Sequence, residues 1–280
     1  MDFLSFIAFN SLISHPPKQI KKLTMYIRAE SVSRFNEMLS SKISPNDADL
    51  LDIICNAQEF ENVKVRPEEI EEMEKLKKEC PLDIRTPIED FQGKCCVLMQ
   101  AFISCSRVKS FTLISDSNYI ASNAGRVARA LFEMVLKLGK AGAALKLLRI
   151  AKSTDKRIWW FQTPMRQFES ELPQNVYKAL ESRSDTSKTG FDGFESALSL
   201  LEMQPGEVGQ FCHSSKIGSK IQKCVRFLPN IAIDCKVQPV TRSILRFQVT
   251  LTPSFSWSPR WHGGALGFWI WVEDAGNNRM

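Results

Sequence analysis

Hydrophobic side chains recur at helical spacing through most of the chain and change to strand spacing near its end. Between residues 30 and 228, apolar positions return every three or four residues, which predicts a succession of amphipathic helices. After Pro229 the period becomes two, and apolar residues alternate with polar ones, as in half-buried antiparallel strands. The pattern therefore predicts an α+β chain that is mainly α-helical.

The clearest helical pattern covers residues 117–138. An apolar stripe roughly 100° wide consists of Ile120, Ala124, Val127, Ala128, Leu131, Val135 and Leu138. The opposite side carries Ser122, Arg126, Arg129, Glu133 and Lys137. Such a helix buries one face and presents a basic face, which is what a protein needs to line a channel for an anionic polymer.

A second basic face accompanies the next helix along the chain. Its apolar stripe consists of Ala143, Leu147, Leu148 and Ala151. The basic residues beside that stripe are Lys146, Arg149, Lys152 and Lys156. Two consecutive helices thus carry the same combination of a core-facing side and a cationic side.

The helix that follows Pro67 is acidic. Its glutamates are Glu68, Glu69, Glu71, Glu72 and Glu74. We interpret them as a solvated face with i,i+4 ion pairs such as Glu71–Lys75. A catalytic role is the less favoured alternative, because surface carboxylates lack the desolvation that tunes a catalytic acid.

Three shorter motifs give local predictions. Ser44 is a good N-cap for a helix that begins at Pro45. The aromatic-rich residues 158–168 indicate core packing in preference to a base-stacking platform. Residues 215–221 favour a plain helix–turn–helix linker, and the alternative is a hairpin whose backbone amides hold a phosphate.

Strands are expected in three places after Pro229. They cover residues 231–237, 245–251 and 268–272. A β-sandwich needs about seven strands, so this sheet is expected to have an open edge and one uncovered apolar face. On that reasoning the chain stops inside a domain.

The composition narrows the class of protein without indicating a reaction. The chain has 280 residues, of which 44% are hydrophobic, and this length suits roughly two domains. A net charge of +6 fits a nucleic acid or an acidic protein as partner, although many solvated proteins are equally basic. Residues 1–14 are apolar but too short to span a bilayer, so no membrane partner is expected.

The eight cysteines and three histidines do not form the pattern of a metal site. No Cys-x-x-Cys pair occurs, and structural zinc needs four converging ligands. We therefore expect no metal and no cofactor, and we interpret the cysteines as buried free thiols in a reducing compartment.

Sequence signatures of ATP hydrolysis are missing from the chain. Gly93-Lys94 is an isolated pair that lacks the upstream glycine and the following hydroxyl of a phosphate-binding loop. The acidic motif of helicase motors and the Gly-x-Ser-x-Gly elbow of hydrolases are also missing. The chain is therefore not expected to be an enzyme by itself.

Several motifs, in this order along the chain, resemble the Sec-63 (Brl) unit of Ski-type DExH helicases. They are VKVRPEEIEE at residues 63–72, SFTLISDS at 110–117, NAGRVARALFE at 123–133, DKRIW at 155–159, PMRQF at 164–168, QPVTRS at 238–243 and FWIWVED at 268–274. The match is strongest to the unit that follows the first cassette in the helicase subunits of cointegrator-type complexes. It covers roughly residues 25–280.

This resemblance implies a division of the chain into parts. Residues 24–170 would form a helical bundle with a ratchet-like helix at 117–138, and residues 171–228 would form a helix-loop-helix. Residues 229–280 would be an incomplete fibronectin-III or immunoglobulin-like sandwich. Residues 1–23 match nothing in the family.

The resemblance also implies partners and a site. The bundle would pack on the RecA domains of a helicase and close around a single strand of RNA or DNA. That strand would run along Asn123, Arg126, Arg129 and Lys137. The alternative for the arginines is pairing with acidic residues of the helicase core. The resemblance implies further partners, namely other subunits of a cointegrator-type complex. It also implies a place in nucleus and cytoplasm and a role in ribosome rescue, transcription coactivation or DNA repair.

Some features depart from the family pattern. A tryptophan usually follows the ratchet helix, where residues 138–142 here read LGKAG, and residues 184–193 look like an insertion. The RecA and winged-helix domains are not in the chain. Two alternatives to a strand-guiding module therefore stay open, namely a protein-interaction scaffold and a truncated, non-functional gene product.

Overall fold

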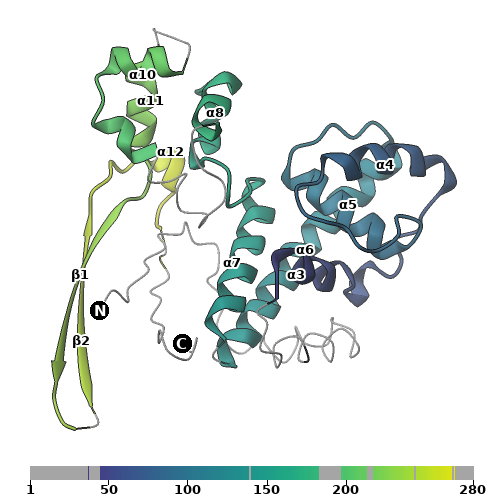
Figure 1. Cartoon of the computed structure of the whole chain (residues 1–280), viewed down its shortest axis with the longest axis horizontal. Coiled ribbons are helices and arrows are strands. Elements are labelled where there is room, and N and C mark those ends of the chain that lie inside the picture. The colour runs from purple at the N-terminus through teal and green to yellow at the C-terminus, as the bar shows by residue number, and fades with distance from the viewer. Residues whose placement is uncertain are drawn as a thin grey trace. The chain divides into compact units, whose positions relative to one another are not determined.

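The computed structural model describes residues 37, 45–138, 140–182, 197–212, 217–242, 244–266 and 268 (Figure 1). The chain divides between Trp160 and Phe161 into two compact units. Both are mainly helical, and the second also contains a two-stranded antiparallel sheet. The predicted boundaries at residues 23, 170 and 228 stay predictions.

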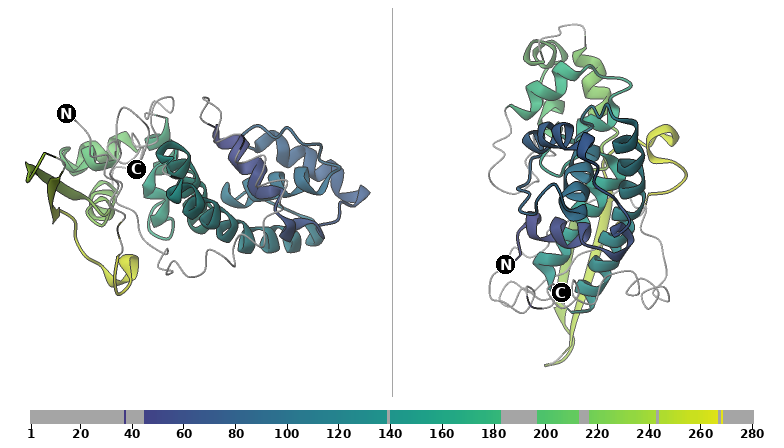
Figure 2. Two further views of the ribbon diagram at one scale, coloured as in Figure 1. Left: turned by 90° about the horizontal axis from the view of Figure 1, so that it is seen from below. Right: turned by 90° about the vertical axis from the view of Figure 1, so that its right-hand side faces the viewer.

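The first unit is helical throughout its described part. Its elements are α3 (Asp47–Cys55), η3 (Gln58–Phe60), η4 (Pro67–Glu69), α4 (Ile70–Glu79), α5 (Phe91–Ile103), α6 (Phe111–Lys137) and α7 (Ala141–Lys156). Helix α5 is buried along most of its length and packs against α3, α4 and α6. Helices α6 and α7 run side by side and bury their apolar stripes against each other (Figure 2).

Helix α3 begins later than the sequence predicts. Asn46, rather than Ser44, is its N-cap, and Ser44 lies outside the described residues. The Asp49 backbone N–H donates to the Asn46 side chain at 2.7 Å, and the Asn46 backbone N–H donates to the Asp49 carboxylate at 3.1 Å. This reciprocal capping satisfies two backbone donors at once.

Helix α6 begins six residues earlier than the range 117–138 predicts, at Phe111. The Ser110 backbone N–H donates to the Glu72 carboxylate at 3.1 Å, so α4 caps the helix from outside. This cap comes from a side chain far away in the sequence, which periodicity does not detect.

The second unit packs short helices around a small core. Its elements are η5 (Pro164–Phe168), α8 (Gln174–Glu181), η6 (Ser199–Leu201), α10 (Pro205–Phe211), α11 (Gly218–Val225), β1 (Ile231–Pro239), β2 (Leu245–Pro253) and α12 (Pro259–His262). A Cβ on Gly218 would lie 1.7 Å from the Pro205 carbonyl oxygen, so glycine allows α10 and α11 to touch. Residues 215 and 216, which begin the 215–221 segment, lie outside the described part.

Strands β1 and β2 form the antiparallel hairpin that the alternation predicts (Figure 1). Apolar residues pair across it on one face, as in Ile233 opposite Leu251 and Val237 opposite Phe247. That face is largely exposed, with Val237 and Phe247 each 53% exposed. This apolar face is open in the described part of the chain, whereas the predicted third strand at 268–272 lies outside the described residues except for Phe268.

The cysteines are free thiols, and five of the eight are buried. Burial raises the pKa values of Cys55 and Cys95 above their ordinary range, so these thiols stay protonated. Within the described part of the chain, no three His, Cys, Asp or Glu side chains converge as a metal ion would require. None of the described helices is both long and apolar enough to cross a membrane.

Candidate nucleic-acid interface

The exposed side of α6 carries the predicted site residues Asn123, Arg126 and Arg129. The Arg126 guanidinium donates to Glu59 at 2.7 Å and to the Asn123 amide oxygen at 2.9 Å. Asn123 in turn donates to the Tyr119 carbonyl one turn earlier. The structure therefore brings Asn123 and Arg126 together, and it adds Glu59, which the sequence did not single out.

Glu59 holds Arg126 from the short helix η3. Its side chain is only 10% exposed, and its backbone carbonyl accepts the Tyr119 hydroxyl at 2.8 Å. Its second carboxylate oxygen is buried and has no hydrogen-bond partner among the described residues. Removing Arg126 would leave a buried and uncompensated charge, so this ion pair is costly to separate.

Arg129 pairs with a different carboxylate in a more open place. Its guanidinium lies 2.5 Å from Asp155 on α7, and the two side chains are 28% and 25% exposed. The pair crosses the contact between α6 and α7 at Gly125, where a Cβ would lie 3.0 Å from Asp155 Oδ1. Glycine therefore makes room for the carboxylate that Arg129 binds.

Both arginines thus pair with carboxylates of their own unit. The sequence left two alternatives, contact with a strand or pairing with acidic residues of a helicase core, and it did not foresee Glu59 and Asp155. The fourth predicted residue, Lys137, ends α6, and its side chain lies outside the described part. The roles of all four residues in binding stay predictions.

The second basic face divides into two halves along α7. Lys146 donates to the Pro45 carbonyl at 2.7 Å, and Arg149 lies near Asp47, so this half fastens the start of α3. Lys152 and Lys156 flank Asp155 instead. Burial, helped by Lys156, lowers the pKa of Lys152 to about 6.

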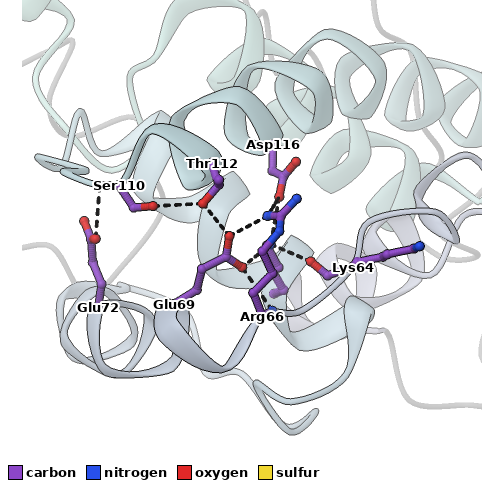
Figure 3. A network of polar contacts seen from close by, with 8 residues as sticks. Lys64, Arg66, Glu69, Glu72, Ser110, Thr112 and Asp116 are labelled. Carbon is purple, nitrogen blue, oxygen red and sulfur yellow. Dashed lines mark hydrogen bonds and ion pairs between the residues drawn. The ribbon is translucent and has the colours of Figure 1, made fainter.

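A separate charged cluster, the α6 anchor, lies near the start of α6 (Figure 3). Its members are Arg66, Glu69, Lys94, Thr112 and Asp116. Lys94 Nζ lies 2.6 Å from Glu69 and 2.7 Å from Asp116, and the Lys94 and Glu69 side chains have no exposed surface. The anchor joins η4, α5 and α6 through charge-assisted hydrogen bonds.

Glu69 therefore does not belong to a solvated acidic face as predicted. Burial alone would raise its pKa, but hydrogen bonds from Lys94, Thr112 and Arg66 lower that pKa to about 2. The other half of the prediction is confirmed, because Glu71 and Lys75 pair at 2.5 Å on the exposed side of α4. Apolar periodicity cannot distinguish the two glutamates, since the partners of Glu69 come from distant helices.

Lys94 has a structural role inside the helical core of the first unit. It also donates to the Lys64 carbonyl at 2.7 Å, so its ammonium group is satisfied inside the core. Gly93 beside it packs so closely that a Cβ would lie 1.8 Å from the Pro87 carbonyl oxygen. The one sequence signal of this role is a lysine within the apolar run of α5.

Comparison with known proteins places these features in a family. The sequence profile described as the Sec63 Brl domain matches residues 24–280. The chain is 38% identical over 258 residues to chicken "Activating signal cointegrator 1 complex subunit 3" and 36% identical over 249 residues to the human "U5 small nuclear ribonucleoprotein 200 kDa helicase". It is 34% identical over 254 residues to the Arabidopsis thaliana "DExH-box ATP-dependent RNA helicase DExH14".

These alignments cover most of this chain but only a small part of each relative. They include 91%, 89% and 90% of this chain but 11% of each relative. The chain therefore corresponds to about a tenth of proteins whose names describe helicases or a subunit of a larger complex.

Proposed function

Because this chain belongs to the Sec63 Brl domain family, we propose that it guides a single strand of RNA or DNA along α6 as an accessory module of an ATP-dependent helicase. The observation that carries this proposal is the two-sided build of α6. One side is buried against α5 and α7, and the other presents Arg126 and Arg129. A rigid helix with exposed guanidinium groups is suited to phosphate contacts.

The mechanism we propose is electrostatic. Arg126 and Arg129 would hold backbone phosphates, so binding would be largely independent of sequence and would weaken as salt rises. The ATPase motor would reside in RecA domains outside this chain, and this module would contribute no catalytic residue. The open apolar face of β1 and β2 would be completed in a fibronectin-III-like sandwich.

We extend the proposal to the cellular setting. The relatives named after a cointegrator complex and after a small nuclear ribonucleoprotein support an assembly with other subunits. We place this assembly in nucleus and cytoplasm as part of the proposal. Ribosome rescue, transcription coactivation and DNA repair are the processes that such an assembly would serve.

Exposed apolar side chains favour a second candidate, a protein-interaction scaffold. Phe111 at the start of α6 is 83% exposed, and Val237 and Phe247 lie open on the hairpin. Monomeric proteins rarely expose contiguous apolar patches of large area, and such patches mark interaction sites. A scaffold would bind partner subunits through these residues and would not need Arg126 and Arg129.

Fluorescence anisotropy of a labelled single-stranded oligouridylate tests the proposal. The purified chain would be titrated over a salt series beside Arg126→Glu/Arg129→Glu. Lys75→Glu/Lys78→Glu, on the exposed side of α4, is a control with the same change in charge. Salt-sensitive binding that only the α6 variant loses supports strand guiding. A folded chain that does not bind, or an α6 variant that binds normally, overturns it.

A further inference from the structure

The two basic helix faces meet at one carboxylate, Asp155. Arg129 reaches it from α6 at 2.5 Å. On α7, Lys152 lies three residues before Asp155 and interacts electrostatically with both Asp155 and Lys156. A single negative charge is therefore set beside a guanidinium group from α6 and two lysine side chains of α7.

The backbone at this point is shaped around the carboxylate. Gly125 of α6 faces Asp155 Oδ1 and the Thr154 methyl group, and a Cβ would approach Oδ1 to 3.0 Å. Any larger residue on α6 would push the carboxylate outward. Gly125 thus leaves room on α6 for the Asp155 carboxylate, next to Arg129 and Thr154.

We propose that Arg129, Lys152 and Lys156 form a phosphodiester-binding site on the seam between α6 and α7, and that Asp155 is its built-in competitor. This inference rests on the proposed function, since the ligand is a phosphate of the guided strand. A carboxylate and a phosphodiester each present anionic oxygens that a guanidinium group binds in the same fork geometry. The strand displaces Asp155 from Arg129 when it binds.

Asp155, and not Glu59, is the carboxylate that can exchange. Both members of the Arg129–Asp155 pair retain about a quarter of their side-chain exposure, so Asp155 can turn into water when a phosphate replaces it. Glu59 is 10% exposed and already has one buried oxygen without a partner among the described residues. Taking Arg126 away from Glu59 would therefore cost much more than taking Arg129 away from Asp155.

The chemistry of Lys152 agrees with this site. The charged groups that interact with Lys152 are Asp155 and Lys156 on α7, and Arg129 of α6 forms an ion pair with Asp155. Burial lowers the pKa of Lys152, so the amine is poorly charged in the absence of a strong anion. A phosphate in place of Asp155 would favour the protonated amine and would gain a second charged donor.

Asp155→Asn tests the proposal in the full chain. It retains the size of the side chain and removes its charge. We expect the affinity for labelled single-stranded oligouridylate to rise about fivefold, the effect of one charge at contact distance in a mostly aqueous setting. The slope of log affinity against log salt should stay close to that of the wild type, because the number of phosphate contacts does not change.

Two variants control for general effects of charge and for position. Asp83→Asn removes an exposed carboxylate from the same unit and should leave the affinity unchanged. Lys152→Met/Asp155→Asn should lose most of the gain, because one cation of the site is gone. Thermal unfolding of each variant shows whether it is folded under the assay conditions.

The outcomes separate the inference from the proposed function. Binding by the wild type that Arg126→Glu weakens and Asp155→Asn strengthens supports both. If Asp155→Asn binds no better than wild type, or binds more weakly, Asp155 positions Arg129 and is not a competitor, so the inference is overturned alone. If neither wild type nor Asp155→Asn binds, the proposed function falls, and the inference falls with it.

Discussion

Helix α6 carries two charge clusters that differ in depth. The α6 anchor near its first turns is closed, with Lys94 and Glu69 fully shielded from solvent. The two arginines farther along the helix are partly open, since Arg126 is 45% and Arg129 28% exposed, although Glu59, the partner of Arg126, is only 10% exposed. The same kinds of side chain thus fix the helix in one place and stay within reach of a ligand in the other.

The difference in depth changes what each cluster contributes. A buried charge that loses its partner is left in a low-dielectric interior, so each member of the anchor holds the others in place. An exposed pair has a small net stabilising effect, because water competes with it. Depth therefore divides α6 into a structural part and a part that can bind.

The largest effect is expected from Lys94→Met. This change leaves Glu69 and Asp116 without their shared ammonium group, and we expect the free energy of unfolding to fall by about 3–5 kcal/mol. Urea denaturation followed by circular dichroism measures the change. A decrease below about 1 kcal/mol would mean that the anchor does not hold the fold, and the contrast between the two clusters would disappear.

The second effect is the pH dependence due to Glu69. Its pKa is about 2 in the folded chain and near 4.5 when unperturbed, so its contribution to stability is complete above about pH 5 and is lost as the pH falls toward 2. The shift corresponds to about 3 kcal/mol. Denaturation at several pH values should show that Glu69→Gln removes this part of the acid sensitivity. An unchanged acid profile would contradict the lowered pKa.

Lys152 is less buried than Lys94 of the α6 anchor and less exposed than Arg126. Its charge lowers the stability of the folded chain, whereas the charge of Glu69 raises it. Its pKa is about 6 in the folded chain and 10.5 when unperturbed, so the unfolded chain binds the proton more tightly. The stability lost to this lysine is greatest below pH 6 and is recovered as the pH rises toward 10.5. Lys152→Met should therefore raise the free energy of unfolding at pH 7 by at least about 1 kcal/mol. A destabilised variant with an unaltered pH profile would contradict this.

The smallest effect on stability is expected from Arg129→Gln. Because the Arg129–Asp155 pair is partly exposed, the free energy of unfolding should change by less than about 1 kcal/mol. The same variant should reduce the salt dependence of strand binding by about 0.7 in slope. Stability loss comparable to that of Lys94→Met would show that the open pair is structural as well.

The sequence predicted those parts of the fold that depend on local pattern. The stripe on α6, the strand alternation on each side of residue 240 and the Glu71–Lys75 pair all follow from periodicity and spacing. The early start of α6, the burial of Glu69 and the Asn46 cap were missed. The first two depend on partners from distant elements, and the third on a reciprocal bond that competed with a plausible cap two residues earlier.

The sequence predicted the residues of the candidate site on α6 but not the carboxylates that pair with them. The helical pattern identified Arg126 and Arg129 by their common face, and the motif resemblance added Asn123 and supplied the role of all three. The sequence did not foresee Glu59 and Asp155, because an ion pair across two helices leaves no periodic trace. Asp155 belonged to a motif that was already noted, DKRIW, but its position over Gly125 is visible only in three dimensions.

Photocrosslinking tests the central claim most directly. A single-stranded RNA that contains thiouridine would be irradiated with the full chain, and the crosslinked peptides would be identified by mass spectrometry. We expect crosslinks on the exposed side of α6 between Asn118 and Glu133 and on the adjoining end of α7 around Asp155. Crosslinks confined to the β1–β2 hairpin or to α4, or none from a folded chain, would contradict it.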